Sequence, residues 1–174
     1  MKNLKALALT ALTLAATVAP TVQARPADRV VTPDRVPATH RALAQTINKV
    51  GVTIYDGRNT KICQPTEKGA TLGYYQFHAN YVVLCTNNGN MGDMLETLAH
   101  EAVHLAQDCK FGGVASKQIG PLGDWKKLVD TLPAYKAETI VNLYDKEDWA
   151  VEVEAFYFED NAQAANNLVK KFCF

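Results

Sequence analysis

The stretch LAHEAVHLAQDC, residues 98–109, carries two histidines four positions apart with a glutamate after the first. On an α-helix, residues i and i+4 lie one turn apart on the same face, so both imidazoles can reach one Zn²⁺ at about 2.0–2.1 Å. A glutamate beside them can take a proton from the metal-bound water. We therefore predict His100 and His104 as zinc ligands and Glu101 as the general base.

The helix that carries this motif is predicted for residues 93–108 and should have two different faces. Asp93 and Glu96 form a D-x-x-E arrangement that resembles a capping box at its start. At about 100° per residue, His100 and His104 fall together on one side of the helix. The apolar residues fall on roughly the opposite side: Leu95, Leu98, Ala99, Ala102, Leu105 and Ala106. We expect this apolar side to be buried and the histidines to face a cleft.

A catalytic zinc site usually has three protein ligands and one water. The longer pattern HExxHxxGxxH, which supplies a third histidine, is absent. The best candidates lie in WAVEVEAFYFED, residues 149–160, where Glu152 and Glu154 are two apart and point to different sides of a helix. The apolar stripe of this helix lies nearer to Glu154, which favours Glu154 facing inward. The small Ala155, three residues after Glu152, would instead let the helix approach the motif closely at Glu152.

HExxH followed by a helix with E-x-E-A resembles the gluzincin clan of zinc metallopeptidases, in its small single-domain form. The resemblance covers about residues 81–165. It implies a zincin-like fold, Zn²⁺ as the cofactor, and a helical glutamate followed by a small residue as the third ligand. The E-x-x-A pattern maps onto Glu152, so Glu152 is the implied ligand and Glu154 the alternative.

The chain departs from the clan's pattern at Phe156, where many members carry an aspartate that supports a ligand histidine. Glu159 or Asp108 would have to take over this role. In the same class of enzyme, an edge strand above the zinc binds the substrate backbone by strand addition. Residues 81–85 (YVVLC) fit such a strand, and they fit a plain core strand equally well.

The N-terminus has the layout of a secretory signal peptide, predicted for residues 1–24. Two lysines precede an apolar run, and Val22-Gln23-Ala24 offers small residues at the cleavage positions. Residues 25–37 contain three prolines and are predicted to form an extended arm. The remaining residues, 38–174, are enough for a single metallopeptidase-like domain. The protein is expected to be exported, to a periplasm or to the medium.

The charge balance argues against a nucleic-acid partner. The chain has 18 basic and 18 acidic residues, and removal of the two signal-peptide lysines leaves 16 against 18. No basic field that would bind nucleic acid or an anionic membrane remains. After the signal peptide, no segment is apolar for long enough to span a bilayer.

The four cysteines predict two disulfides, because an even number in an exported chain is typical of paired cysteines. We predict Cys63–Cys85, which flanks a likely hairpin, and Cys109–Cys173. The second bond would join the end of the motif helix to the C-terminal helix that supplies the third ligand.

The remaining elements predict an α+β fold, with a small N-terminal sheet followed by a helical C-terminal half. Strands are expected at residues 52–55, 71–78 and 81–85, with a tight turn at 79–80. Helices are expected at residues 38–50, 125–132, 134–145 and 146–171, with a loop at 111–124.

These features predict an exported zinc metallopeptidase with peptide or protein substrates. The alternative is a disulfide-stapled binding module that keeps a zincin-like shape without turnover. The intact Glu101 favours the enzyme, because a purely structural zinc site needs no general base.

Overall fold

The computed structural model describes residues 36–67, 69–114 and 118–174. The predicted signal peptide and nearly all of the predicted arm lie outside these residues. The elements follow the order α1 (Ala38–Lys49), β1 (Thr53–Asp56), η2 (Lys61–Cys63), β2 (Gly73–Gln76), β3 (Tyr81–Leu84), α2 (Met91–Phe111), α3 (Lys126–Val129), α4 (Ala134–Leu143), α5 (Trp149–Phe158) and α6 (Ala162–Cys173). The α+β class with a small sheet is therefore confirmed. Within the described part of the chain, no helix is both long and apolar enough to cross a membrane.

The sheet has three strands in the order β1-β3-β2. β1 pairs with β3 in parallel, and β2 pairs with β3 antiparallel, with Tyr75 opposite Val82. β3 is therefore the central strand, so of the two interpretations of residues 81–85 the plain core strand is confirmed and the edge strand is wrong. The burial of Val82, Val83 and Leu84 explains this position, because a central strand is covered on both faces. β2 is the strand beside the motif helix.

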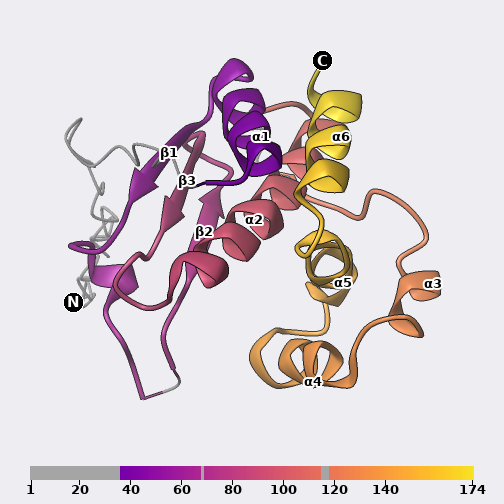
Figure 1. Ribbon diagram of the computed structural model, residues 1–174. Coiled ribbons are helices and arrows are strands. Elements are labelled where there is room, and N and C mark those ends of the chain that lie inside the picture. Colours follow the sequence, from indigo (N-terminus) through magenta and orange to yellow (C-terminus); the bar gives the residue numbers. More distant parts are fainter. Residues whose placement is uncertain (1–35, 68, 115–117) are drawn as a thin grey trace, which may run out of the picture.

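The long helix α2 forms the centre of the molecule. It packs against β2 and β3 and contacts α1, α5 and α6 (Figure 1). The predicted apolar face is mostly in the core, which also contains residues from α1, α6 and the sheet: Leu43, Ile47, Val52, Val82, Leu98, Ala102, Leu105, Ala165 and Val169. The histidines lie on the opposite face and are nearly buried, since His100 and His104 are only 8% and 9% exposed, and His100 lines a cleft as predicted. The neighbouring helix α5 contributes to covering this polar face.

The residues that cap the N-terminus of α2 differ from the predicted ones. Asn90 is the N-cap, and its side chain accepts hydrogen bonds from the backbone N–H groups of Gly92 and Asp93. The Asp93 carboxylate accepts from the Asn90 backbone N–H in return, at 2.7 Å. The capping box is therefore formed by Asn90 and Asp93, and the predicted pair of Asp93 and Glu96 is wrong. Asn90 is the N-cap because its short side chain accepts from two backbone N–H groups of the first turn at once.

The predicted single helix over residues 146–171 is two helices, α5 and α6. Asn161 begins α6, and its side-chain oxygen accepts from the backbone N–H of Ala164 at 3.0 Å. A new cap of this kind supports a second helix start that apolar periodicity cannot reveal. The Cys109–Cys173 bond consequently joins α2 to α6, not to the helix that carries Glu152.

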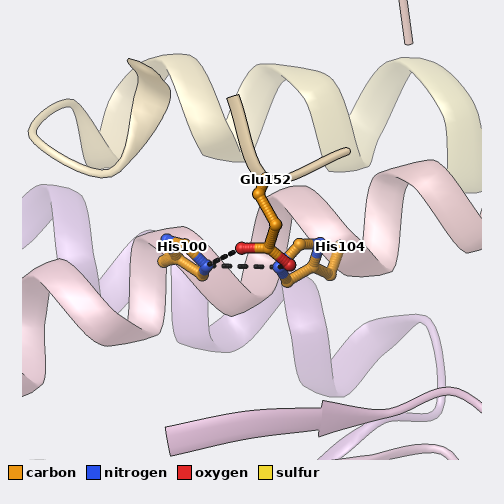
Figure 2. Close-up of side chains that lie close together, drawn as sticks. All are labelled: His100, His104 and Glu152. Atoms are coloured by element: carbon orange, nitrogen blue, oxygen red, sulfur yellow. Dashed lines mark hydrogen bonds and ion pairs between the residues drawn. The ribbon is translucent and has the colours of Figure 1, made fainter. Parts of the chain in front are cut away.

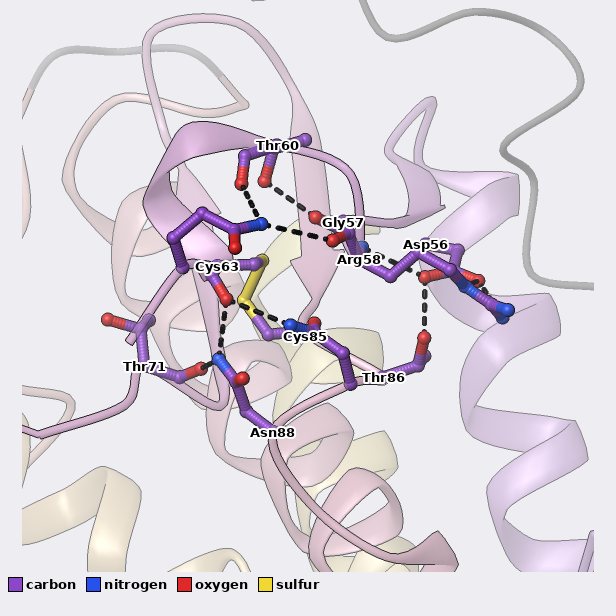
Figure 3. The surroundings of a disulfide bond; sticks show 11 residues. Asp56, Gly57, Arg58, Thr60, Cys63, Thr71, Cys85, Thr86 and Asn88 are labelled. Atoms are coloured by element: carbon purple, nitrogen blue, oxygen red, sulfur yellow. Dashed lines mark hydrogen bonds and ion pairs between the residues drawn. A yellow bond between two sulfur atoms is a disulfide. The ribbon is translucent and has the colours of Figure 1, made fainter. Parts of the chain in front are cut away.

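Both disulfides pair as predicted, Cys63–Cys85 and Cys109–Cys173. Figure 3 shows the surroundings of the first bond. There the Asn88 side-chain amide donates to the backbone carbonyls of Cys63 and Thr71, both at 2.8 Å. The disulfide and Asn88 together hold the segment that leads into β2.

Candidate metal centre

Two neighbouring helices bring three ligand-type side chains together. His100 and His104 come from α2, and Glu152 comes from α5 (Figure 2). The two Nε2 atoms are 3.2 Å apart, and each lies 3.4 Å from one oxygen of the Glu152 carboxylate. All three side chains are buried. The structure thus brings Glu152, and not Glu154, to the two histidines of the motif.

Each histidine ring makes a hydrogen bond through its Nδ1 atom, while its Nε2 atom faces Glu152. Glu159 Oε2 lies 2.8 Å from His100 Nδ1, and Gln107 Oε1 lies 2.8 Å from His104 Nδ1. Since an ionised carboxylate only accepts, the His100 Nδ1–H must donate. Of the two residues predicted to support a ligand histidine, Glu159 and Asp108, it is Glu159 that contacts His100. Asp108 is engaged elsewhere, where it accepts a hydrogen bond from the Tyr75 hydroxyl at 2.7 Å.

The orientation of Gln107 follows from its other partners. Its amide nitrogen donates to the Val151 carbonyl at 3.0 Å and to Glu154 Oε2 at 2.9 Å. Its oxygen therefore faces His104 as an acceptor, so His104 Nδ1 carries the proton. Glu154 also accepts from the backbone N–H groups of Leu122 and Gly123, at 2.6 and 2.7 Å. The alternative ligand Glu154 thus has a supporting role behind His104 and anchors the 122–123 segment.

These hydrogen bonds leave acceptors converging at the centre. With both Nδ1 atoms donating, each neutral ring carries its lone pair on Nε2, and these lone pairs meet the Glu152 carboxylate. Glu152 Oε2 is buried and has no hydrogen-bond partner among the described residues. Buried acceptors in such proximity need a proton or a cation between them. His100, His104 and Glu152 therefore form a group that could bind a metal ion.

The pKa shifts of His100 and Glu152 also indicate that a positive charge is favoured between these side chains. Burial by itself would lower the pKa of His100, but the adjacent carboxylates of Glu152 and Glu159 outweigh burial and raise that pKa to about 10. Burial would raise the pKa of Glu152, but the charges of His104 and His100 outweigh it and lower that pKa. When no cation is bound, a proton on His100 offsets the carboxylates. A metal ion bound between these side chains would therefore compete with this proton.

Glu101 and Tyr144 lie beside this group and line a cleft of about 580 Å³. Glu101 is buried, and its pKa is raised mainly by burial, against the lowering charges of His100 and His104. Tyr144 follows α4, and its pKa is raised by burial and by the charges of Glu152 and Glu101. Four parts of the chain border the cleft, and they include Thr71, Leu72 and Gly73 before and in β2, Thr97, His100 and Glu101 in α2, Thr139, Leu143 and Tyr144 at α4, and Phe156 and Glu159 at α5.

The edge of β2 reaches into the centre directly. The backbone N–H of Tyr75 donates to the Glu101 carboxylate. Its hydroxyl group donates to Asp108, so both ends of Tyr75 tie β2 to α2. Gly73 lies two residues earlier, where a Cβ atom would come within 2.5 Å of Thr97 Cγ2. Close packing of β2 on α2 therefore requires glycine at this position.

A second group of carboxylates, Glu96, Glu159 and Asp160, also lies close together. Its charge is met by a side chain of the protein, since Lys136 Nζ lies 2.8 Å from Glu159 Oε1 and 2.7 Å from Asp160 Oδ2. We therefore do not consider this group a metal site.

A profile of the family "Domain of unknown function (DUF8637)" matches residues 35–174. The chain belongs to this family. The match begins close to residue 38, where we predict the folded domain to begin. Comparisons with curated proteins and with solved structures gave no match. The DUF8637 family description assigns no activity, so the geometry of the site has to support any function.

Sequence reasoning missed two supporting residues, Gln107 and Lys136. For Gln107 a signal existed, because it lies three residues after His104 on the same helical face. For Lys136 there was none, because a lysine normally lies at the surface and its burial depends on tertiary partners.

Proposed function

We propose that this DUF8637 protein is an exported zinc metallopeptidase that hydrolyses peptide bonds. The observation that carries the proposal is the spacing of the ligand atoms on the three side chains. In a tetrahedral zinc site with bonds of about 2.0–2.1 Å, neighbouring ligand atoms are about 3.3 Å apart. The Nε2 atoms of His100 and His104 are 3.2 Å apart, and they lie 3.4 Å from Glu152 Oε2 and Oε1 respectively, so that one carboxylate faces both rings at this spacing. Three protein ligands leave a fourth position open, as in catalytic zinc sites.

A bound zinc ion would act as a Lewis acid that polarises the peptide carbonyl group and makes water acidic. The chain supplies the proton transfer. Glu101 lines the cleft, and the raised pKa of its carboxyl group suits a group that takes a proton from water and passes it to the leaving amine. The N–H of Tyr75 fixes the orientation of this carboxylate.

Tyr144 is the candidate donor to the oxyanion that develops on the attacked carbonyl. It lines the same cleft as His100 and Glu101, and its raised pKa keeps the hydroxyl group protonated. Tyr135 and Tyr157, the other tyrosines that follow α2, are less suitable for this role. Tyr135 is 64% exposed and Tyr157 is 39% exposed, and neither borders the cleft.

The outer edge of β2 is the candidate site for the substrate backbone. The Leu72 carbonyl accepts from the Cys85 N–H, so residue 72 faces β3. Because backbone groups alternate in direction along an antiparallel pair, Gly73 and Tyr75 face away from β3. This direction agrees with the contact between Tyr75 and Glu101. An extended peptide in the cleft would then pair with Gly73 by strand addition.

The test is the substitution Glu101→Gln, which keeps size and removes the base. We expect it to bind zinc like the wild type and to hydrolyse an unstructured protein substrate at least about 100-fold more slowly. Glu138→Gln, the same change on the exposed side of α4, is the matched control. Undiminished, chelator-sensitive hydrolysis by Glu101→Gln would refute the mechanism. A wild type that binds zinc but cleaves nothing would favour the binding module.

A further inference from the structure

A buried lysine lies behind the metal centre. Lys136 on α4 is 2% exposed, although a charged lysine is rarely buried. Its Nζ atom lies 2.8 Å from Glu159 Oε1, 2.7 Å from Asp160 Oδ2 and 3.1 Å from the Phe156 carbonyl. An ammonium group has three N–H donors, so these three acceptors satisfy it completely. The removal of this charge from water costs free energy, which the contacts with these three acceptors have to offset.

Glu159 links the lysine to the centre, because its two oxygens serve different partners. Oε1 pairs with Lys136, and Oε2 accepts from His100 Nδ1 at 2.8 Å. With both oxygens engaged, the carboxylate cannot rotate without breaking one of the contacts. The ring of His100 is thereby held with Nε2 toward Glu152. The ammonium group also offsets the negative charge that would otherwise act on the ring.

We propose that Lys136 is a positioning residue of the metal centre, which acts on His100 through Glu159. The inference rests on the proposed metal centre and deepens it, because it makes zinc affinity depend on a residue of α4. This helix also supplies Thr139 and Leu143 to the wall of the cleft.

A purely structural role is the competing explanation. α4 buries only two side chains, Lys136 and Ile140, so either residue can be needed to hold the helix in place. Ile140 has no polar side-chain atom that could bond Glu159. Ile140→Ala is therefore a matched control, which loosens α4 without removing the charge behind His100.

The experiment measures the zinc dissociation constant by competition with a chromophoric chelator, with thermal unfolding in parallel. Lys136→Met, which keeps the apolar stem, should weaken zinc binding at least about tenfold, since partners of ligand histidines typically contribute 10–100-fold. Ile140→Ala should lower the melting temperature and leave the zinc constant within about twofold. Lys136→Arg should restore most of the affinity. If Lys136→Met does not fold, Lys136→Gln replaces it.

A double-mutant cycle with Glu159→Gln tests the route of the effect. If Lys136 acts through Glu159, Lys136→Met should cost nothing further in the Glu159→Gln background. Equal zinc affinity of wild type and Lys136→Met, equal losses in Lys136→Met and Ile140→Ala, or full additivity in the cycle would each overturn the proposal. A wild type that binds no zinc would also overturn it. Zinc binding without peptide cleavage would refute only the peptidase function and leave the role of Lys136 standing.

Discussion

Glu152 and Glu154 should respond to alanine substitution in opposite ways. Both are buried on α5, two residues apart, and each serves as the control for the other. Glu154 accepts three hydrogen bonds, from Leu122, Gly123 and Gln107. At about 1 kcal/mol each, Glu154→Ala should lower the free energy of unfolding by about 3 kcal/mol. For a domain of this size the melting temperature should fall by about 10 °C.

Zinc binding should be weakened much more by Glu152→Ala than by Glu154→Ala. At a free zinc concentration of 1,000 times the wild-type dissociation constant, bound zinc stabilises the fold by about 4.1 kcal/mol. Removal of a ligand should cost more than the roughly 100-fold that a supporting residue can cost. Glu152→Ala should therefore keep at most about 1.4 kcal/mol of this stabilisation at the same zinc concentration. Glu154→Ala should keep most of it, with at most about tenfold weaker binding through Gln107.

The assay is thermal unfolding followed by circular dichroism, with zinc and with chelator, combined with a zinc titration. The zinc-dependent rise in melting temperature reports the ligand role, and the melting temperature with chelator reports the supporting role. If Glu154→Ala abolished the zinc-dependent rise while Glu152→Ala kept it, the assignment of the third ligand would be refuted.

Three further changes have defined outcomes. Tyr144→Phe should retain zinc but lower kcat about 100-fold, because a donor to the oxyanion is lost; an unchanged kcat would exclude Tyr144 from this role. Gly73→Ala should lower the free energy of unfolding by about 1–3 kcal/mol, since the added Cβ would lie 2.5 Å from Thr97 Cγ2 and 2.6 Å from the Val83 carbonyl oxygen. Urea unfolding would show this loss. In chelator, the raised pKa of His100 predicts that its ion pairs stabilise the fold fully below about pH 6.5, and that this contribution is lost as the pH rises toward about 10. Urea unfolding from pH 6 to pH 10 should show this decline with chelator and not with saturating zinc.

Much of the centre was accessible to local reasoning. The i, i+4 spacing of His100 and His104 depends only on helix geometry, so it specifies a shared face before any fold is known. The choice between Glu152 and Glu154 was not accessible in the same way. Both are buried in the structure, so the apolar stripe could not separate them. Their roles depend on what α2 and the 122–123 segment present to each face of α5.

The sequence by itself determined the motif helix, the presence of paired cysteines, and the order of a small sheet before a helical half. These features follow from periodicity, spacing and residue type, which act over short distances along the chain. Only the tertiary structure decided that β3 is the central strand and that α5 ends before α6. It also decided that Lys136 is buried beside Glu159. The physical reason is that strand order, helix breaks and buried charges depend on partners distant in sequence, and those partners meet only when the chain is folded.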